Sequence, residues 1–183
     1  LLEQWVCNVP PVIVHPVDVM YPGFPTRMDW PSNVCLTYIP KLSGTGGGVG
    51  VGVGSAVGTG GALMGTWKGL KKDNTSLIAF EPKQSPFLTT GKAGAHKVEG
   101  IGVGFEPPFL DRTALSDIRT IDQDLGFSMC RRLAKEEGIF CGASTGLNVV
   151  GAIELAKEMK PEQRVVTLAC DSGLKYLGGH IYV

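Results

Sequence analysis

Apolar and polar positions follow a helical or strand-like rhythm only after about residue 61. Leu63, Met64, Trp67 and Leu70 recur at the spacing of one helix face, which predicts a helix over residues 62–72 that ends on two lysines. Short apolar runs predict strands at residues 77–81, 117–121 and 164–170. The last run is the clearest candidate for a buried strand.

Two longer helices are predicted among these strands, at residues 124–137 and 145–159. Gly138 ends the first as a C-terminal glycine does, and Pro161 follows the second. The expected inward faces are Leu125, Met129 and Leu133 in the first helix and Val149, Ile153, Ala156 and Met159 in the second. Alternating strands and helices predict an α/β fold of three layers, an open and mostly parallel sheet with helices on both faces.

Ahead of this region the chain has a different character. Residues 1–41 hold seven of the twelve prolines, which disfavours long helices and central strands but permits short edge strands such as residues 12–14. Residues 42–61 alternate Val and Gly and contain Gly-Thr-Gly-Gly twice, which indicates a weak strand running into a loop. We therefore divide the chain into a Pro-rich segment of unknown role (1–41), a Gly/Val-rich strand and loop (42–61) and an α/β domain (62–183).

Composition narrows the class of protein. With 17 acidic and 17 basic residues in 183, the chain has no net charge to attract nucleic acid. Five cysteines without a CxxC pair argue against a disulfide framework or a metal site, and for buried thiols in a reducing, cytoplasmic compartment. No secretory leader is recognisable, and the uncharged stretch 42–67 is too rich in glycine to favour a membrane span.

The second Gly-Thr-Gly-Gly, at residues 58–61, stands between a predicted strand and the helix that begins near Ala62. Residues without bulky side chains allow consecutive backbone N–H groups to turn toward one point, where the helix N-terminus adds partial positive charge. The Thr59 hydroxyl supplies another donor. This pattern favours a phosphate-binding loop, and a plain glycine-rich turn is the alternative.

Three other segments are candidates for a ligand site. Ser144, in Gly-Ala-Ser-Thr-Gly, is either the N-cap of its helix or a partner for a heterocycle nitrogen at the carboxyl edge of the sheet. Asp171 opens an Asp-Ser-Gly turn after the last strand, which either lines that pocket or is only a turn. Alternate glycines in loop 96–105 suit a flat ligand, whereas a surface loop with solvated His96 and Lys97 is the alternative.

Taken in order, these motifs resemble the cysteine synthase (O-acetylserine sulfhydrylase) family of fold-type II pyridoxal-phosphate enzymes. The resemblance covers about residues 58–176. It joins Gly-Thr-Gly-Gly at 58–61, Phe-Glu-Pro at 80–82, Ser-Pro at 85–86, loop 96–105, Glu-Glu-Gly at 136–138, Ser-Thr-Gly at 144–146 and Asp-Ser-Gly at 171–173 with Tyr176. Each motif is common alone, whereas the ordered set is specific.

The resemblance implies a set of roles. The cofactor 5′-phosphate would be bound at Gly58, Thr59, Gly60, Gly61 and Ala62, the pyridine nitrogen by Ser144, with Asp171 in the same pocket and Gly100, Ile101 and Gly102 facing the substrate cleft. It also implies the family's reaction, in which O-acetylserine loses acetate through an aminoacrylate intermediate and sulfide adds to give cysteine. The family is usually homodimeric and binds the C-terminal tail of serine acetyltransferase.

Two departures from the family pattern stand out. Ala62 replaces the usual second threonine of the phosphate loop. The family's Schiff-base lysine, in a Ser-x-Lys-Asp-Arg-like context, and its Ser/Thr-Ser-Gly-Asn-type carboxylate loop are not recognisable, and Lys41 is the only lysine before the loop. The catalytic lysine is therefore unknown, and we expect the chain to match the C-terminal part of the enzyme.

Several alternatives stay open. Cystathionine β-synthase and serine or threonine dehydratase share the phosphate loop, and a pseudoenzyme or fragment could keep the fold without the lysine. A dinucleotide-binding domain would use Gly58 and Gly60 to open the helix and Glu81 to bind a ribose, but its third glycine would be Leu63.

Overall fold

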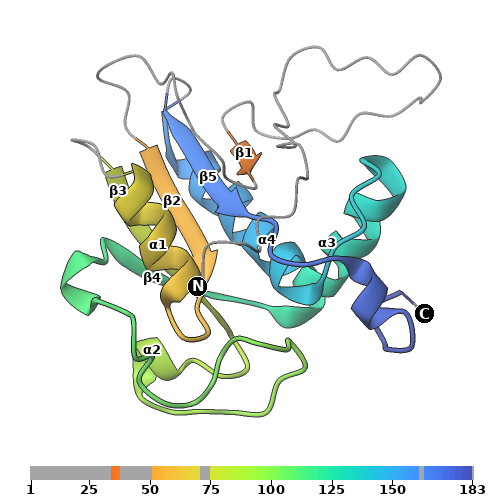
Figure 1. The fold of residues 1–183 in the computed structure, drawn as a ribbon, viewed down its shortest axis with the longest axis horizontal. Coiled ribbons are helices and arrows are strands. Elements are labelled where there is room, and N and C mark those ends of the chain that lie inside the picture. Colours follow the sequence, from red (N-terminus) through yellow and green to blue (C-terminus); the bar gives the residue numbers. More distant parts are fainter. Residues whose placement is uncertain (1–33, 38–50, 71–74, 161–162, 183) are drawn as a thin grey trace, which may run out of the picture.

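One parallel sheet organises the described part of the chain. The computed structural model describes residues 34–37, 51–70, 75–160 and 163–182, so the expectations for Val12, Lys41, Lys71, Lys72 and Pro161 fall outside it. The strands are β1 (Val34–Thr37), β2 (Val51–Ala56), β3 (Thr75–Pro82), β4 (Asp117–Ile121) and β5 (Arg164–Leu168). Their order is β1-β5-β2-β3-β4, and every neighbouring pair is parallel (Figure 1).

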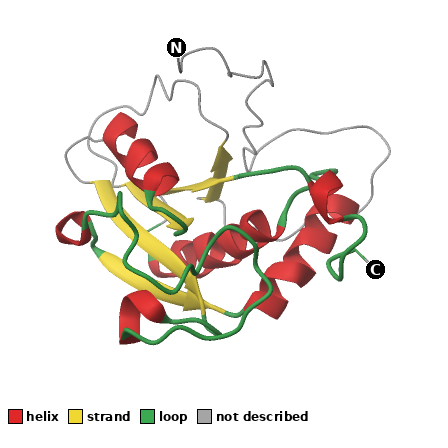
Figure 2. Ribbon diagram, turned by 60° about the horizontal axis from the view of Figure 1, so that its bottom comes forward, coloured by secondary structure: helices red, strands yellow, loops and turns green. Residues whose placement is uncertain are grey.

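Helices cover both faces of this sheet. They are α1 (Gly61–Leu70), α2 (Phe87–Thr90), α3 (Gln123–Glu136) and α4 (Ala143–Glu158), with short 3₁₀ helices at Arg112–Ala114 and Gly173–Tyr176. α1 lies on one face, while α3 and α4 lie side by side on the other (Figures 1 and 2). The three-layer α/β prediction is confirmed.

Successive residues of β3 show why two separate cores form. Leu77 and Ala79 pack with α1 in one cluster, whereas Ile78 and Phe80 pack with α3 and α4 in the other. Alternate side chains of a strand point to opposite faces, so a strand buried on both faces is apolar throughout. This explains why the apolar run 77–80 predicts a strand here.

The Val-Gly alternation of β2 has a packing role. An added Cβ on Gly54 would lie 2.4 Å from the Phe80 ring, and one on Gly151 of α4 would lie 2.8 Å from the same ring. The ring thus fills a slot between the strand and the helix that only glycines leave open. Gly52 likewise approaches Leu155 of α4. The tract is therefore a central strand with one bare face, not a weak strand.

Helix faces were predicted less well than helix positions. Leu125 is 54% exposed, so its assignment to the inward face of α3 is wrong. The buried positions of α3 are Gly126, Phe127, Met129, Cys130 and Leu133. The inward face of α4 is confirmed at Val149 and Ala156, whereas Ile153 and Met159 are only partly buried. Gly138 has φ +69°, as expected of a glycine just past a helix end.

Candidate functional site

The candidate residues gather at one edge of the sheet. Because all five strands are parallel, their carboxyl ends share an edge, and ligands of open α/β folds bind there. The 58–61 loop follows β2, the Asp171 turn follows β5, and α4 begins beside them. The structure therefore places the predicted phosphate loop and the predicted ring-nitrogen partner at the same end of the molecule.

The 58–61 loop forms a cradle of backbone donors. Within the described residues, no acceptor meets the N–H groups of Gly58, Thr59, Gly60 or Gly61. Gly60 has φ +88°, and a Cβ there would lie 2.8 Å from the Leu110 N atom, so only glycine fits. Four free donors at the N-terminus of α1 suit an anion such as a phosphate. Thr59 and Ala62 are exposed at this loop.

Loop 96–110 packs directly against this cradle. The Gly102 N–H donates to Val57 O at 3.1 Å, and the Phe109 N–H donates to Thr59 O at 3.0 Å. A Cβ on Gly58 would lie 2.2 Å from Gly100 O, so the two loops touch. The predicted phosphate loop and cleft residues Gly100, Ile101 and Gly102 are thus brought together.

His96 is a structural residue of this loop rather than a solvated one. Its Nδ1 atom accepts from the Val98 N–H at 3.3 Å, and its Nε2 lies 3.0 Å from Gly102 O. Because Nδ1 accepts, the neutral ring carries its proton on Nε2 and donates it to that carbonyl. The expectation that His96 is solvated is wrong, while Lys97 is exposed as expected.

Ser144 is buried at the start of α4 and does not cap it. The N-cap is Gly142, so Ser144 is the second residue of the helix, and the N-cap interpretation is wrong. Ser144 is only 7% exposed. Burial raises the pKa of the nearby Cys170 thiol, which follows β5, and the Ser144 hydroxyl partly offsets this rise. The neighbouring Thr145 hydroxyl accepts from the Cys170 N–H at 3.0 Å.

Asn148 ties the two halves of the site together and was missed by the sequence analysis. Its Oδ1 accepts from the Ala56 N–H at 2.6 Å, and its Nδ2 donates to Leu168 O at 2.9 Å. The fully buried amide therefore joins the ends of β2 and β5 one turn along α4 from Ser144. A single polar residue within the apolar run 147–152 was the available signal.

Asp171 anchors the turn after β5. Its Oδ2 accepts from the Tyr176 hydroxyl at 2.8 Å, while its Oδ1 is buried with no partner among the described residues. Burial, and then this hydrogen bond, raise the pKa of Tyr176 above its usual range, so the hydroxyl stays protonated. A Cβ on Gly142 would meet Oδ1, which explains the glycine ahead of α4.

Glu81 is committed to local structure. Its buried carboxylate accepts from the Leu88 N–H at 2.6 Å and from the Thr89 N–H and hydroxyl at 3.1 and 2.7 Å. It therefore satisfies the first turn of α2 and is not free to bind a ribose. A dinucleotide-binding domain would therefore lack its acidic residue for the ribose, which argues against that alternative.

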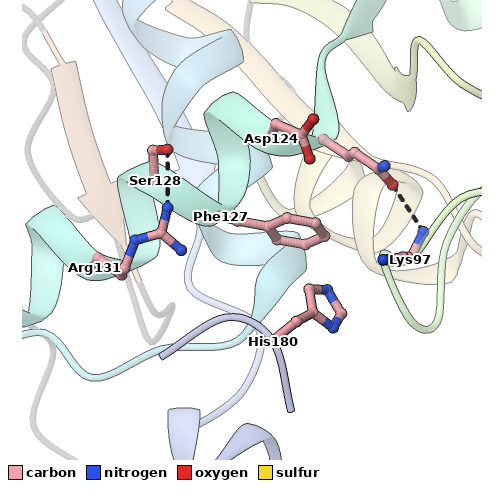
Figure 3. Close-up of a pocket in the computed structure, with 7 residues that line it drawn as sticks. Lys97, Asp124, Phe127, Ser128, Arg131 and His180 are labelled. Carbon is pink, nitrogen blue, oxygen red and sulfur yellow. Dashed lines mark hydrogen bonds between the residues drawn. The ribbon is translucent and has the colours of Figure 1, made fainter. Parts of the chain in front are cut away.

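Two cavities lie beside loop 96–103. One, of about 500 Å³, is lined by His180 and by residues 96–103, which include Gly100, Ile101 and Gly102. The other, of about 400 Å³, lies along α3 and is lined by Lys97, Gln123, Asp124, Phe127, Ser128, Arg131 and His180 (Figure 3). Only the first contains predicted site residues. The second has Phe127 edge-on to His180, with ring centroids 4.7 Å apart.

Comparison with known proteins decides the family. The profile of the family described as pyridoxal-phosphate dependent enzyme matches residues 48–171, about two-thirds of the chain. The chain belongs to this family. Pyridoxal phosphate is thus the cofactor of the family, as predicted, and the cradle, the buried Ser144 and the buried, unpaired Asp171 Oδ1 are polar groups suited to such a ligand.

Similar members of the pyridoxal-phosphate enzyme family include cysteine synthases. A Staphylococcus aureus cysteine synthase is 42% identical over 130 residues, 70% of this chain and 42% of that protein. The Entamoeba histolytica cysteine synthase structure has a TM-score of 0.67 at 31% identity, covering 73% of this chain and 40% of that one. An O-acetylserine dependent cystathionine β-synthase from Helicobacter pylori has a TM-score of 0.68 at 36% identity, covering 74% and 44%.

The chain thus spans less than half the length of these relatives.

None of the helices in the described ranges is both long and apolar enough to span a bilayer. Cys130 and Cys141 are buried as expected, whereas Cys170 is exposed, and each of these residues is a free thiol.

Proposed function

We propose that this chain is the cofactor-binding, C-terminal part of a cysteine synthase. The reaction would be β-replacement on an activated serine, with O-acetylserine and sulfide giving cysteine and acetate. The observation that carries the proposal is the cradle at 58–61, whose four N–H groups have no acceptor in the described part of the chain, at the same sheet edge as the buried Ser144. The cysteine synthases among the similar proteins support the choice of reaction.

Each end of the cofactor would have its own protein partner. The 58–61 N–H groups and the Thr59 hydroxyl would hold the phosphate, and Ser144 would hydrogen-bond the ring nitrogen. When bound, pyridoxal phosphate draws electrons from the amino-acid Cα, which eases loss of the α-proton. A neutral serine at the nitrogen leaves the ring less electron-withdrawing than a carboxylate would, which suits β-elimination and replacement.

The substrate would enter along loop 96–103. The cavity of about 500 Å³ at this loop is lined by Gly100 and Gly102, which present no side chain of their own to a small amino acid. Asp171 would shape the pocket through its bond to Tyr176. The residue that moves the α-proton is unknown, because no lysine of the chain stands in the family's Schiff-base context.

The proposal extends to partners and compartment. By resemblance to cysteine synthases we propose a homodimer, and a serine acetyltransferase tail that enters the same cleft. Free thiols at Cys130, Cys141 and Cys170 support a reducing, cytoplasmic location.

Pyridoxal phosphate binding tests this proposal directly. We expect the purified 183-residue chain to bind the cofactor reversibly, measured by absorption titration. Gly58→Ala should abolish binding, because its Cβ would collide with Gly100 O and force the cradle away from the cleft loop. Thr59→Val should weaken binding about five- to tenfold through loss of one hydrogen bond.

The control for these variants is Gly65→Ala. Gly65 lies on the exposed side of α1 with nothing within 4 Å of an added Cβ, so affinity should not change. Equal binding by wild type, Gly58→Ala and Thr59→Val would show that the cradle does not hold the phosphate.

A second candidate is cystathionine β-synthase. The Helicobacter pylori structure described as an O-acetylserine dependent cystathionine β-synthase favours it at 36% identity. The same cradle would serve both reactions, which differ in whether sulfide or a larger thiol attacks. Product analysis with each thiol separates them.

A further inference from the structure

One peptide unit of the 58–61 cradle is oriented from outside the cradle. The carbonyl oxygen of Thr59 accepts from the Phe109 N–H at 3.0 Å. In a planar trans peptide the carbonyl and the N–H of the next residue point in opposite directions. The Gly60 N–H therefore points away from Phe109, and in the described part of the chain no acceptor meets it. The hydrogen bond from Phe109 thus sets the direction of one cradle donor.

The segment that carries Phe109 is closed by a two-pronged ion pair. Arg112 Nε donates to Glu106 Oε1 at 2.6 Å, and Arg112 Nη2 donates to Glu106 Oε2 at 2.8 Å. The hydrogen bond from Arg112 holds the pKa of Glu106 below its usual range, so the carboxylate stays charged at neutral pH. The ion pair therefore joins the two ends of segment 106–112, with Phe109 at its middle.

The same arginine ties this segment to the sheet. Arg112 Nη1 donates to Leu88 O of α2 at 2.9 Å, and the Leu88 N–H is in turn bound by the buried carboxylate of Glu81 in β3. Both side chains of the ion pair are about half exposed, and most exposed ion pairs contribute little. A bidentate pair with a third hydrogen bond is different, because the guanidinium is held in one orientation.

The cradle lies directly against this segment. A Cβ on Gly60 would lie 2.8 Å from the Leu110 N atom, and a Cβ on Gly61 would lie 3.9 Å from the Phe109 ring. A shift of segment 106–112 would therefore reach the cradle donors.

We propose that Glu106 and Arg112 are positioning residues of the phosphate cradle, whose ion pair keeps Phe109 in place and thereby keeps the Gly60 N–H directed at the bound phosphate. This inference rests on the proposed function, since it assumes that the cradle binds the cofactor phosphate. It goes beyond that function in giving a role to two residues that none of the predicted motifs includes.

Glu106→Gln tests this role, because two effects on phosphate binding have opposite signs. Removing a negative charge near an anion site should by itself tighten phosphate binding slightly. Releasing Arg112 should instead weaken binding about fivefold, because the Gly60 N–H is no longer held in one direction. We expect weaker binding of both pyridoxal phosphate, measured by absorption titration, and inorganic phosphate, measured by competition.

A second ion pair of the same kind supplies the control. Arg119 Nη1 and Nη2 donate to the Glu158 carboxylate at 2.9 and 2.6 Å. Glu158 is the last residue of α4, at the opposite end of that helix from Ser144. Glu158→Gln changes the net charge by the same amount and breaks an equivalent pair, so the affinity for both ligands should stay that of the wild type.

A double-mutant cycle assigns the effect to the ion pair itself. In an Arg112→Ala background, Glu106→Gln should weaken phosphate binding no further, because its partner is already gone. The same fivefold loss in both backgrounds would contradict the proposal.

Amide hydrogen exchange tests the positioning step without any ligand. The Phe109 amide should exchange about fivefold faster or more in Glu106→Gln, since the segment that holds its hydrogen bond opens more often. Glu158→Gln should leave this rate unchanged.

Failure of the inference and failure of the proposed function give different results. An unchanged Phe109 exchange rate, or unchanged or tighter phosphate binding by Glu106→Gln, would overturn the inference and leave the proposed function standing. A wild-type chain that binds neither pyridoxal phosphate nor inorganic phosphate would remove the proposed function, and the inference with it.

Discussion

At the scale of single residues, the Phe80 ring of β3 packs closely against glycines of β2 and α4. The Phe80 ring sits where a Cβ on Gly54 would come within 2.4 Å of it. Gly54→Ala should therefore overpack the core and lower the free energy of unfolding by about 1–3 kcal/mol. Urea unfolding measures the change, and Gly69→Ala is the control, because nothing lies within 4 Å of a Cβ there.

A second substitution identifies Phe80 as the cause. In a Phe80→Leu background, Gly54→Ala should cost clearly less, because the shorter side chain leaves room for the methyl group. Equal costs in both backgrounds would mean that the loss arises elsewhere, for instance from the backbone of β2.

The sequence alone predicts the role of a residue only where the local backbone or packing accepts a single residue type at that position. Gly58 and Gly60 fall in this class, because the backbone at Gly60 and the contact at Gly58 tolerate no side chain. Ser144 does not, because a serine near a helix start suits a cap equally well, and the structure had to show that Gly142 takes that place. The contacts of Asn148 and Cys170 join segments far apart in sequence, so no local pattern reveals them.

At the scale of elements, α3 offers a test of helix register. Leu125 is 54% exposed and Leu133 is fully buried against α4, although the two lie eight positions apart on nearly the same face. Leu125→Glu should change the free energy of unfolding by less than about 0.5 kcal/mol, whereas Leu133→Ala should lower it by about 2–5 kcal/mol. Chemical unfolding of both variants checks this, and a large loss from Leu125→Glu would contradict the observed packing.

The same helix shows how far elements can be predicted. Its limits came within a residue of the observed Gln123–Glu136, because Asp122 accepts from the Asp124 N–H and Gly138 follows the end. Leu125 was misplaced because spacing along a helix does not say where the partner helix stops covering it. The sequence of β2 predicts only a weak strand, because the packing role of its glycines becomes visible only when α4 lies against them.

At the scale of the whole molecule, the region matched in this chain covers less than half of the length of its relatives. The described sheet edge supplies donors for the cofactor, whereas the matched relatives are more than twice as long as the matched region. The fold class could be predicted from alternating elements, because parallel β/α order has few solutions. The family profile matches residues 48–171 and so does not include the N-terminal 41 residues.

The described lysines near the cleft are candidates for an amine that could bind the cofactor covalently. Among the described lysines, Lys97 lines the cavity beside Gly100, and Lys175 pairs with Glu99 at 3.2 Å, so both lie near the cleft. Neither stands in the family's lysine context, and without such an amine the cofactor would sit non-covalently. We expect borohydride to trap no lysine-linked cofactor on the chain.

Cysteine formation should fall by roughly 10²–10⁴-fold or more relative to a complete cysteine synthase, since the α-proton lacks its base. The assay mixes the chain with pyridoxal phosphate, O-acetylserine and sulfide, with the Staphylococcus aureus relative as positive control. Cysteine at a comparable rate, with an adduct mapped to Lys41, Lys97 or Lys175, would contradict this expectation and identify the substitute amine. Replacing that lysine by arginine would then abolish both product and adduct, because arginine keeps the charge but cannot form the imine.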